Sequence, residues 1–176
     1  KLLCAHSDFY YFYTMRKQLT LIVFLFSTFI FSQGLTTSGK IIVDENGNEV
    51  LLRGYTPGGW LVMEGYMMQA EGTAGAQHEF VERFSDLVGE DKTNQFFAKW
   101  RENHFNKEDV DSLAAWGFNS IRVPLHYNLF TLPIQEEPNA NDNTWLETGF
   151  DIIDNVLEWA EPHKMYVILD MHAAPG

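Results

Sequence analysis

The pattern of hydrophobic and polar residues separates a first segment from the rest of the chain. Residues 19–31 are all apolar or hydroxyl-bearing, two cations (Arg16 and Lys17) precede them, and Ser32-Gln33-Gly34 follows. This is the layout of a cleavable secretory signal peptide, which we place at residues 15–34, with residues 1–14 as upstream read-through. As a helix, this apolar run covers about 20 Å, less than the roughly 30 Å hydrocarbon core of a membrane. We therefore expect a secreted or periplasmic protein without a stable membrane anchor, an uncleaved anchor being the alternative.

Beyond Gly39 the pattern becomes that of a folded domain. Two β-rich runs surround Asn46-Gly47, a strong hairpin signal, and the second run leads into a strand and the glycine-rich turn "GYTPGGWLVMEG". Helical patches follow at residues 77–89 and 93–105, separated by glycine. We interpret residues 62–105 as a long, partly helical connection.

From Asn106 onward helices and strands alternate. Asn106 is a candidate N-cap of a helix that ends at Gly117, and a buried strand "FNSIRVPL" follows. After a polar loop at residues 127–143, a second helix carries one apolar stripe and leads to the strand "MYVIL". The stripe consists of Leu146, Phe150, Ile153, Leu157 and Ala160.

This alternation predicts an α/β fold with a parallel sheet, whose functional side chains lie at the carboxyl ends of the strands. By the pattern alone the sheet could be part of a (β/α)₈ barrel or an open doubly wound sheet. No Gly-x-Gly-x-x-Gly or Walker sequence follows a strand, which favours the barrel.

The charge balance narrows the class of ligand. The chain has 24 Asp and Glu against 12 Lys and Arg, a net charge of −12. Such a surface repels nucleic acid and anionic lipid and suits neutral substrates, although plain solubility explains it equally well. The one cysteine, Cys4, precedes the predicted signal peptide, so we expect no disulfide in the mature protein.

Candidate functional residues gather behind the three predicted sheet strands. An arginine inside an apolar strand is costly to bury alone, so Arg122 predicts an acidic partner, either in a binding site or in a purely structural pair. His172 lies two residues past Asp170, on the same side of an extended chain. We expect the substrate-binding and supporting residues to be Trp60, Glu64, Arg122, His126, Tyr127, Asp170 and His172.

Two of these residue groups have other interpretations. His126, Asp170 and His172 could be the ligands of a metal-dependent barrel hydrolase, but no His-x-His or His-Glu-x-x-His spacing is present. We expect no metal and no cofactor. Trp60 and Tyr127 could be core residues or aromatic walls that stack on sugar rings.

Three segments in this order resemble a known family: "LLRGYTPGGWLVMEG", "HFNKEDVDSLAAWGFNSIRVPLHYN" and "MYVILDMHAAPG". Together they are similar to the N-terminal part of glycoside hydrolase family 5, the cellulase family, and particularly to its exo-β-1,3-glucanase-like members. The resemblance implies that residues 35–176 form the N-terminal portion of a (β/α)₈ barrel, ending after its third strand. The implied activity is hydrolysis of β-glucan with retention of configuration.

The resemblance also implies roles for individual residues. Arg122 matches the arginine that hydrogen-bonds the nucleophilic glutamate, and His172 matches a histidine beside the scissile bond. Glu64 matches an acid that holds hydroxyls of the terminal sugar. In this family both catalytic glutamates follow later strands, so we expect them beyond Gly176, and we interpret Glu137 as a loop residue. A non-catalytic secreted β-glucan-binding protein remains the alternative.

Overall fold

The computed structural model describes residues 34–139 and 143–174, which fall into two compact units divided after Leu51. The predicted read-through and signal peptide fall on residues 1–33, outside the described residues, and both stay predictions. Within the described ranges, no helix combines the length and the apolar character needed to cross a membrane.

The first unit contains a short antiparallel pair, β1 (Thr36–Ser38) and β2 (Ile41–Val43). The Asn-Gly turn that the sequence predicted is present, with Gly47 at a φ of +81° and the Asp44 carboxylate accepting backbone N–H groups inside the turn. After the turn, Glu49 pairs with Val43 in an antiparallel bridge, and the N–H of Val50 donates to the carbonyl of Ile42 over 2.8 Å. The predicted hairpin is therefore confirmed, although the run after the turn does not form a full strand and β2 also pairs with β1.

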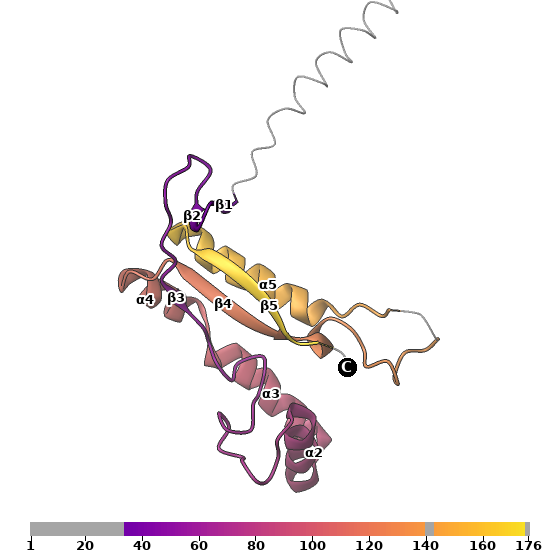
Figure 1. The fold of residues 1–176 in the computed structure, drawn as a ribbon. Coiled ribbons are helices and arrows are strands. Elements are labelled where there is room, and N and C mark those ends of the chain that lie inside the picture. Colours follow the sequence, from indigo (N-terminus) through magenta and orange to yellow (C-terminus); the bar gives the residue numbers. More distant parts are fainter. Residues whose placement is uncertain (1–33, 140–142, 175–176) are drawn as a thin grey trace, which may run out of the picture. The chain divides into compact units, whose positions relative to one another are not determined.

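The second unit is built on a parallel sheet in the order β3-β4-β5 (Figure 1), as the alternation of elements predicted. The strands are β3 (Gly54–Tyr55), β4 (Ser120–His126) and β5 (Tyr166–Ala173). One face of β4 consists of buried apolar side chains that form the centre of the core. These are Ile121, Val123 and Leu125, each at most 3% exposed.

Four α-helices and two 3₁₀ turns connect these strands within the described part of the chain. They are α2 (Gln77–Val88), α3 (Glu90–His104), α4 (Lys107–Ala115), η2 (Tyr127–Leu129), α5 (Glu147–Ala160) and η3 (Glu161–His163). The predicted N-cap is confirmed: Asn106 Oδ1 accepts the N–H groups of Glu108 and Asp109, and Asp109 accepts the N–H of Asn106. This capping box fixes the start of α4, directly before β4.

The helix α5 runs alongside β4 and β5 (Figure 1), and the predicted stripe is confirmed in part: Ala160 is in the core and Ile153 packs against it. Val156 and Ala160 are at most 1% exposed, as core residues of the sheet face. Phe150 and Leu157, which the stripe placed in the core, are 40% and 46% exposed. The buried line of the helix thus shares Ala160 with the predicted stripe and adds Val156, whereas Leu157 lines an open groove beside β5.

Candidate active site

The pairing of β4 with β5 brings the predicted polar residues onto one face of the sheet. Arg122 lies opposite Ile168 and Pro124 lies opposite Asp170 in the parallel register. Because side chains alternate along paired strands, Arg122 and Asp170 share the face turned away from the buried line of β4, and the contacts of His172 with both bring its ring to the same face. This is the face that lines the interior when such a sheet closes into a barrel.

Asp170 is the acidic partner that the position of Arg122 predicted. Its Oδ2 atom forms an ion pair with Nη2 of Arg122 and lies 3.0 Å from Nδ1 of His172. The same Nη2 atom lies 3.3 Å from Nδ1 of His172. The three side chains keep 29–42% of their surface exposed. They form one polar cluster, open to solvent, at the carboxyl end of the sheet.

His126 and Tyr127 lie at the end of the neighbouring strand but do not join this cluster through any hydrogen bond among the described residues. Their rings stack, with centroids 5.0 Å apart. Nδ1 of His126 accepts the N–H of Asn128, 3.3 Å away, at the start of η2. Burial lowers the pKa of His126 below its ordinary value, a hydrogen bond with the Asn128 side chain opposes this lowering, and the charge of His78 adds to it. The His126 ring is therefore held locally, and its role in substrate binding stays a prediction.

The sequence allowed Trp60 to be either a core residue or an aromatic wall for sugars, and in the structure it is a core residue. It is 3% exposed, its ring lies 5.2 Å from that of Phe105, and its indole N–H donates to the carbonyl of Arg101 over 2.8 Å. At 3% exposure the indole has almost no surface left for a sugar ring. Stacking of a sugar on Trp60 stays a prediction that this packing does not support.

The glycine turn before Trp60 is held by side chains that the sequence analysis missed. Trp100 Nε1 donates to the carbonyl of Gly59 over 3.0 Å, and His104 Nε2 lies 3.1 Å from the carbonyl of Gly58. Both rings belong to α3, and they contact each other in a tilted arrangement with their centroids 4.7 Å apart. Their spacing of four residues, with ring nitrogens on one helix face, was the signal available in the sequence.

Glu64 lies in the same connection, at its exposed end. Its Oε2 accepts the phenol of Tyr66 over 3.3 Å, and its backbone carbonyl accepts the N–H groups of Met67 and Met68. Partial desolvation and the charge of Glu64 raise the pKa of the Tyr66 phenol. Tyr66 is 57% exposed and was not among the predicted residues. It adds an aromatic face beside the Glu64 carboxylate.

Glu137 has a structural role instead of being freely solvated. Its carboxylate accepts the backbone N–H of Thr144 at 2.9 Å and the Thr144 hydroxyl at 2.8 Å. These bonds join the middle of the loop between η2 and α5 to the segment just before α5. Both acceptor oxygens are engaged away from the Arg122 cluster, which agrees with the interpretation of Glu137 as a loop residue.

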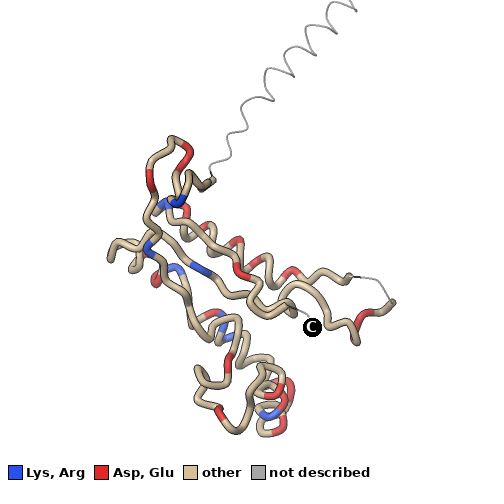
Figure 2. The backbone as a smooth tube through the Cα atoms, viewed as in Figure 1, with Lys and Arg blue, Asp and Glu red and all other residues tan. Residues whose placement is uncertain are grey.

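The helix α5 of the second unit carries a row of acidic side chains. Figure 2 shows acidic residues spread along α5, where Glu147, Asp151, Asp154 and Glu158 follow one another at helical spacing.

Across residues 34–139 and 143–174, no three His, Cys, Asp or Glu side chains are grouped so that they could hold a metal ion. The polar chemistry of the described sheet face therefore rests on Arg122, Asp170 and His172.

Comparison with known proteins places these features in a wider context. The chain is 36% identical over 142 residues to a beta-xylosidase of Phanerodontia chrysosporium, covering 81% of this chain and 28% of that protein. It is 26% identical over 162 residues to glucan 1,3-beta-glucosidase 1 of Schizosaccharomyces pombe, covering 86% of this chain and 38% of the relative. The chain thus spans between about a quarter and two-fifths of these relatives.

A solved structure and a family model agree with this result. The fold is similar to that of rutinosidase from Aspergillus niger, with a TM-score of 0.53 and 20% identity over 70% of this chain and 33% of that one. Residues 76–176, more than half of the chain, match the model of the cellulases, and this segment contains β4, α5 and the Arg122 cluster. The architecture is therefore part of a (β/α)₈ barrel, and the chain belongs to glycosyl hydrolase family 5.

Proposed function

We propose that this chain is the N-terminal part of a secreted retaining glycoside hydrolase that cleaves β-glucans. The single observation that carries the proposal is the cluster of Arg122, Asp170 and His172 at the carboxyl end of the sheet, inside the segment that matches the family. In barrel enzymes this end of the sheet carries the active site. A neutral polysaccharide also suits a chain whose net charge is −12.

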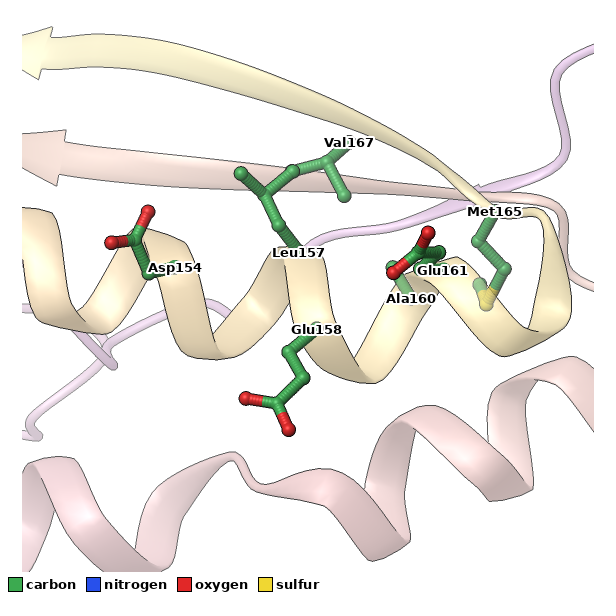
Figure 3. Close-up of a pocket in the computed structure, with 7 residues that line it drawn as sticks. All are labelled: Asp154, Leu157, Glu158, Ala160, Glu161, Met165 and Val167. Atoms are coloured by element: carbon green, nitrogen blue, oxygen red, sulfur yellow. The ribbon is translucent and has the colours of Figure 1, made fainter.

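The open side of the sheet supports a longer barrel. Among the described residues β5 pairs only with β4, and its Ile168, Leu169 and Met171 are 42–49% exposed. Beside it, Leu157 points toward Val167 across a groove of about 540 Å³ between α5 and β5 (Figure 3). Further strand–helix units, supplied by the larger part of a protein as long as its relatives, would cover these apolar side chains.

In the proposed reaction the chain provides binding and electrostatic support, and later strands provide the two carboxyl groups. Retaining glycosidases place these groups about 5 Å apart. One protonates the glycosidic oxygen, and the other attacks the anomeric carbon to form a glycosyl ester, which water then hydrolyses. Both contacts of the Arg122 guanidinium use Nη2, which leaves Nη1 and Nε for the nucleophile. A cation there lowers the pKa of the attacking carboxyl and keeps it ionised.

Sugar hydroxyls would be held by His172 and by the Glu64–Tyr66 pair. His172 is exposed on the face that carries Arg122, and Glu64 offers an acceptor beside an exposed aromatic ring. Carboxylates and imidazoles accept hydrogen bonds from hydroxyl groups, and aromatic faces pack on the apolar faces of sugar rings.

The test uses the full-length protein encoded by the natural gene. It is incubated with β-1,3-, β-1,4- and β-1,6-linked glucans, and released reducing ends are measured. Proton NMR of the first product shows whether the anomeric configuration is retained. We expect release from at least one glucan, with retention. A folded protein that binds glucan without releasing sugar would support the binding-protein alternative instead.

The assay also includes a β-xyloside as a second class of substrate. The relative that is 36% identical is named a beta-xylosidase. A β-xyloside is therefore assayed beside the glucans at equal concentration. Faster turnover of the xyloside would keep the retaining mechanism and replace glucan as the substrate. Inversion of configuration would overturn the mechanism itself.

A further inference from the structure

Asp170 occupies the centre of the polar cluster. A single oxygen, Oδ2, contacts both Nη2 of Arg122 and Nδ1 of His172. Asp170 is also the least exposed of the three side chains, at 29% compared with 40% for Arg122 and 42% for His172. It therefore lies behind the other two, in a position to orient them and with less surface for a ligand.

The backbone alone does not fix the direction of His172. The pairing of β4 with β5 runs residue by residue up to Leu125 and Met171, and then His126 pairs with Ala173. His172 is thus the extra residue of a bulge, without a partner in the ladder. Bulges near active sites redirect side chains, and here the contact with Asp170 holds the redirected ring.

The surroundings of Nδ1 in His172 determine which ring nitrogen carries the proton. Nδ1 faces a carboxylate oxygen at 3.0 Å and a guanidinium nitrogen at 3.3 Å. An ionised carboxylate can accept hydrogen bonds but cannot donate them. If Nδ1 carried no proton, its lone pair would face a lone pair of the Asp170 carboxylate at 3.0 Å, which is repulsive. Nη2 of Arg122 uses one of its two N–H groups for Asp170, and it lies farther from Nδ1, at 3.3 Å, than the carboxylate oxygen does, at 3.0 Å. The favoured neutral form therefore carries its proton on Nδ1 and donates it to Asp170.

We propose that Asp170 is a positioning residue, which holds the neutral ring of His172 in the Nδ1–H form so that Nε2 accepts a hydrogen bond from a sugar hydroxyl. The proposed ligand and catalytic effect rest on the function proposed above, whereas the effect on the tautomer does not. Without the carboxylate, the ring is free to rotate and to carry its proton on Nε2. Nε2 would then be a donor, and the hydroxyl would have to reverse its own hydrogen bond.

The direct test is ¹⁵N NMR of histidine-labelled full-length protein, with the His172 signals assigned by their loss in His172→Gln. In its neutral form, the wild-type ring is expected to show a protonated Nδ1 and an unprotonated Nε2. Asp170→Ala should give mainly the Nε2–H form. Asp170→Asn, which retains an uncharged acceptor, should give a mixture. Asp86→Asn, at an exposed site on α2, should leave the signals unchanged.

Kinetics test whether Asp170 acts through His172. We expect Asp170→Ala to lower kcat/KM about 10- to 100-fold, the usual size of a lost bond to a charged group. Asp170→Asn should recover part of this loss. In the His172→Gln background, Asp170→Ala should lower kcat/KM by a clearly smaller factor, because His172, the residue that Asp170 positions, is already absent.

The outcomes separate the two proposals. A wild-type ring protonated on Nε2, or a tautomer unchanged by Asp170→Ala, would overturn the positioning role even in an active enzyme. Equal losses in both His172 backgrounds would overturn it as well. An inactive wild-type protein with the expected Nδ1–H signal would instead contradict the proposed function and keep the tautomer assignment. Thermal melting of each variant confirms that folded proteins are compared.

Discussion

The carboxylate of Glu137 closes the loop after η2 by accepting two hydrogen bonds from Thr144, at 2.9 and 2.8 Å. Glu137 is followed by Pro138, and a glutamate before proline in a glycosidase sequence is a candidate catalytic residue. The geometry gives this acid a structural role, since both of its oxygens are occupied by its own loop. A structural and a catalytic carboxylate respond differently to substitution, which leads to the first prediction.

We expect Glu137→Ala to destabilise the full-length protein by about 1–2 kcal/mol, the net value of the lost bonds. Activity measured well below the melting temperature should stay within about threefold of wild type, whereas loss of a catalytic carboxylate costs on the order of 10⁴-fold. Both are measured by thermal melting and by kcat/KM. The neighbouring exposed Glu136→Ala is the matched control, with no expected effect on either. A loss of activity above 10³-fold at unchanged stability would make Glu137 a catalytic group.

A close approach between α5 and the segment before it depends on Gly149. A Cβ atom there would lie 2.5 Å from Cε1 of Phe130 and 2.8 Å from the carbonyl oxygen of Leu129. Neither group can move freely, because Phe130 is 6% exposed and the carbonyl is backbone. Gly149→Ala should therefore destabilise the protein by about 1–3 kcal/mol, despite the roughly 1 kcal/mol that alanine contributes to a helix.

Gly75→Ala is the matched control for this substitution. Its added Cβ would meet only Oε2 of Glu79, at 3.8 Å, and its backbone does not need a positive φ. We expect a change within about 0.5 kcal/mol. Denaturant unfolding of both variants decides the question, and equal stabilities would show that α5 can shift to admit the methyl group.

Much of the fold was predictable because its signals are local. Asn106 is three residues before Asp109, and this spacing alone indicates the capping box that the structure contains. The apolar runs around Arg122 and before Asp170 likewise predicted the strands β4 and β5. Their parallel pairing follows from the helix between them.

What the sequence could not show depends on contacts between distant residues. The Asn46-Gly47 signal predicted both the turn and the antiparallel pairing of Val43 with Glu49, but nothing local indicated that β2 would also pair with β1. Leu157 fits an apolar stripe, yet its burial depends on what covers the groove beside Val167. In the candidate site, the sequence could predict that Arg122 has an acidic partner. It could not predict that this same carboxylate also contacts His172, because that contact depends on the bulge in β5.

Asp111 links α4 to the turn η3, and this link should make stability depend on pH. Its carboxylate accepts Nζ of Lys107 and Nε2 of His163, both at 2.7 Å. These hydrogen bonds lower the pKa of Asp111 below its ordinary value. A carboxyl with a lowered pKa in the folded state stabilises the protein above its unfolded pKa of about 3.9. That contribution is lost as the pH falls through the folded value.

We therefore expect Asp111→Asn to lower the melting temperature near neutral pH. The difference from wild type should shrink on acidification below about pH 4. Melting curves between about pH 3 and pH 7 measure this, with the exposed Asp151→Asn on α5 as the control. A difference that stays constant across this range would mean that the ion pairs of Asp111 add nothing to stability.

The last prediction concerns the shape of the Arg122 side chain. Its guanidinium can bind Asp170 through Nη2 and still present Nη1 and Nε to a second carboxylate. The ammonium of a lysine is a point charge that cannot keep this planar arrangement. Arg122→Lys should therefore lower kcat/KM about 100-fold in the full-length enzyme. It should also move the acidic limb of the pH–rate profile upward, since a displaced cation lowers the pKa of the nucleophile less.

Stability should change little, because the Arg122 side chain is 40% exposed and lysine still pairs with Asp170. The measurements are kcat/KM as a function of pH and thermal melting, with Arg83→Lys at an exposed position of α2 as the matched control. Recovery of activity in Arg122→Ala by added guanidinium would identify the planar group as the required feature. If lysine retained activity within about threefold and left the pH profile in place, a positive charge alone would be sufficient, and the pair with Asp170 would be mainly structural.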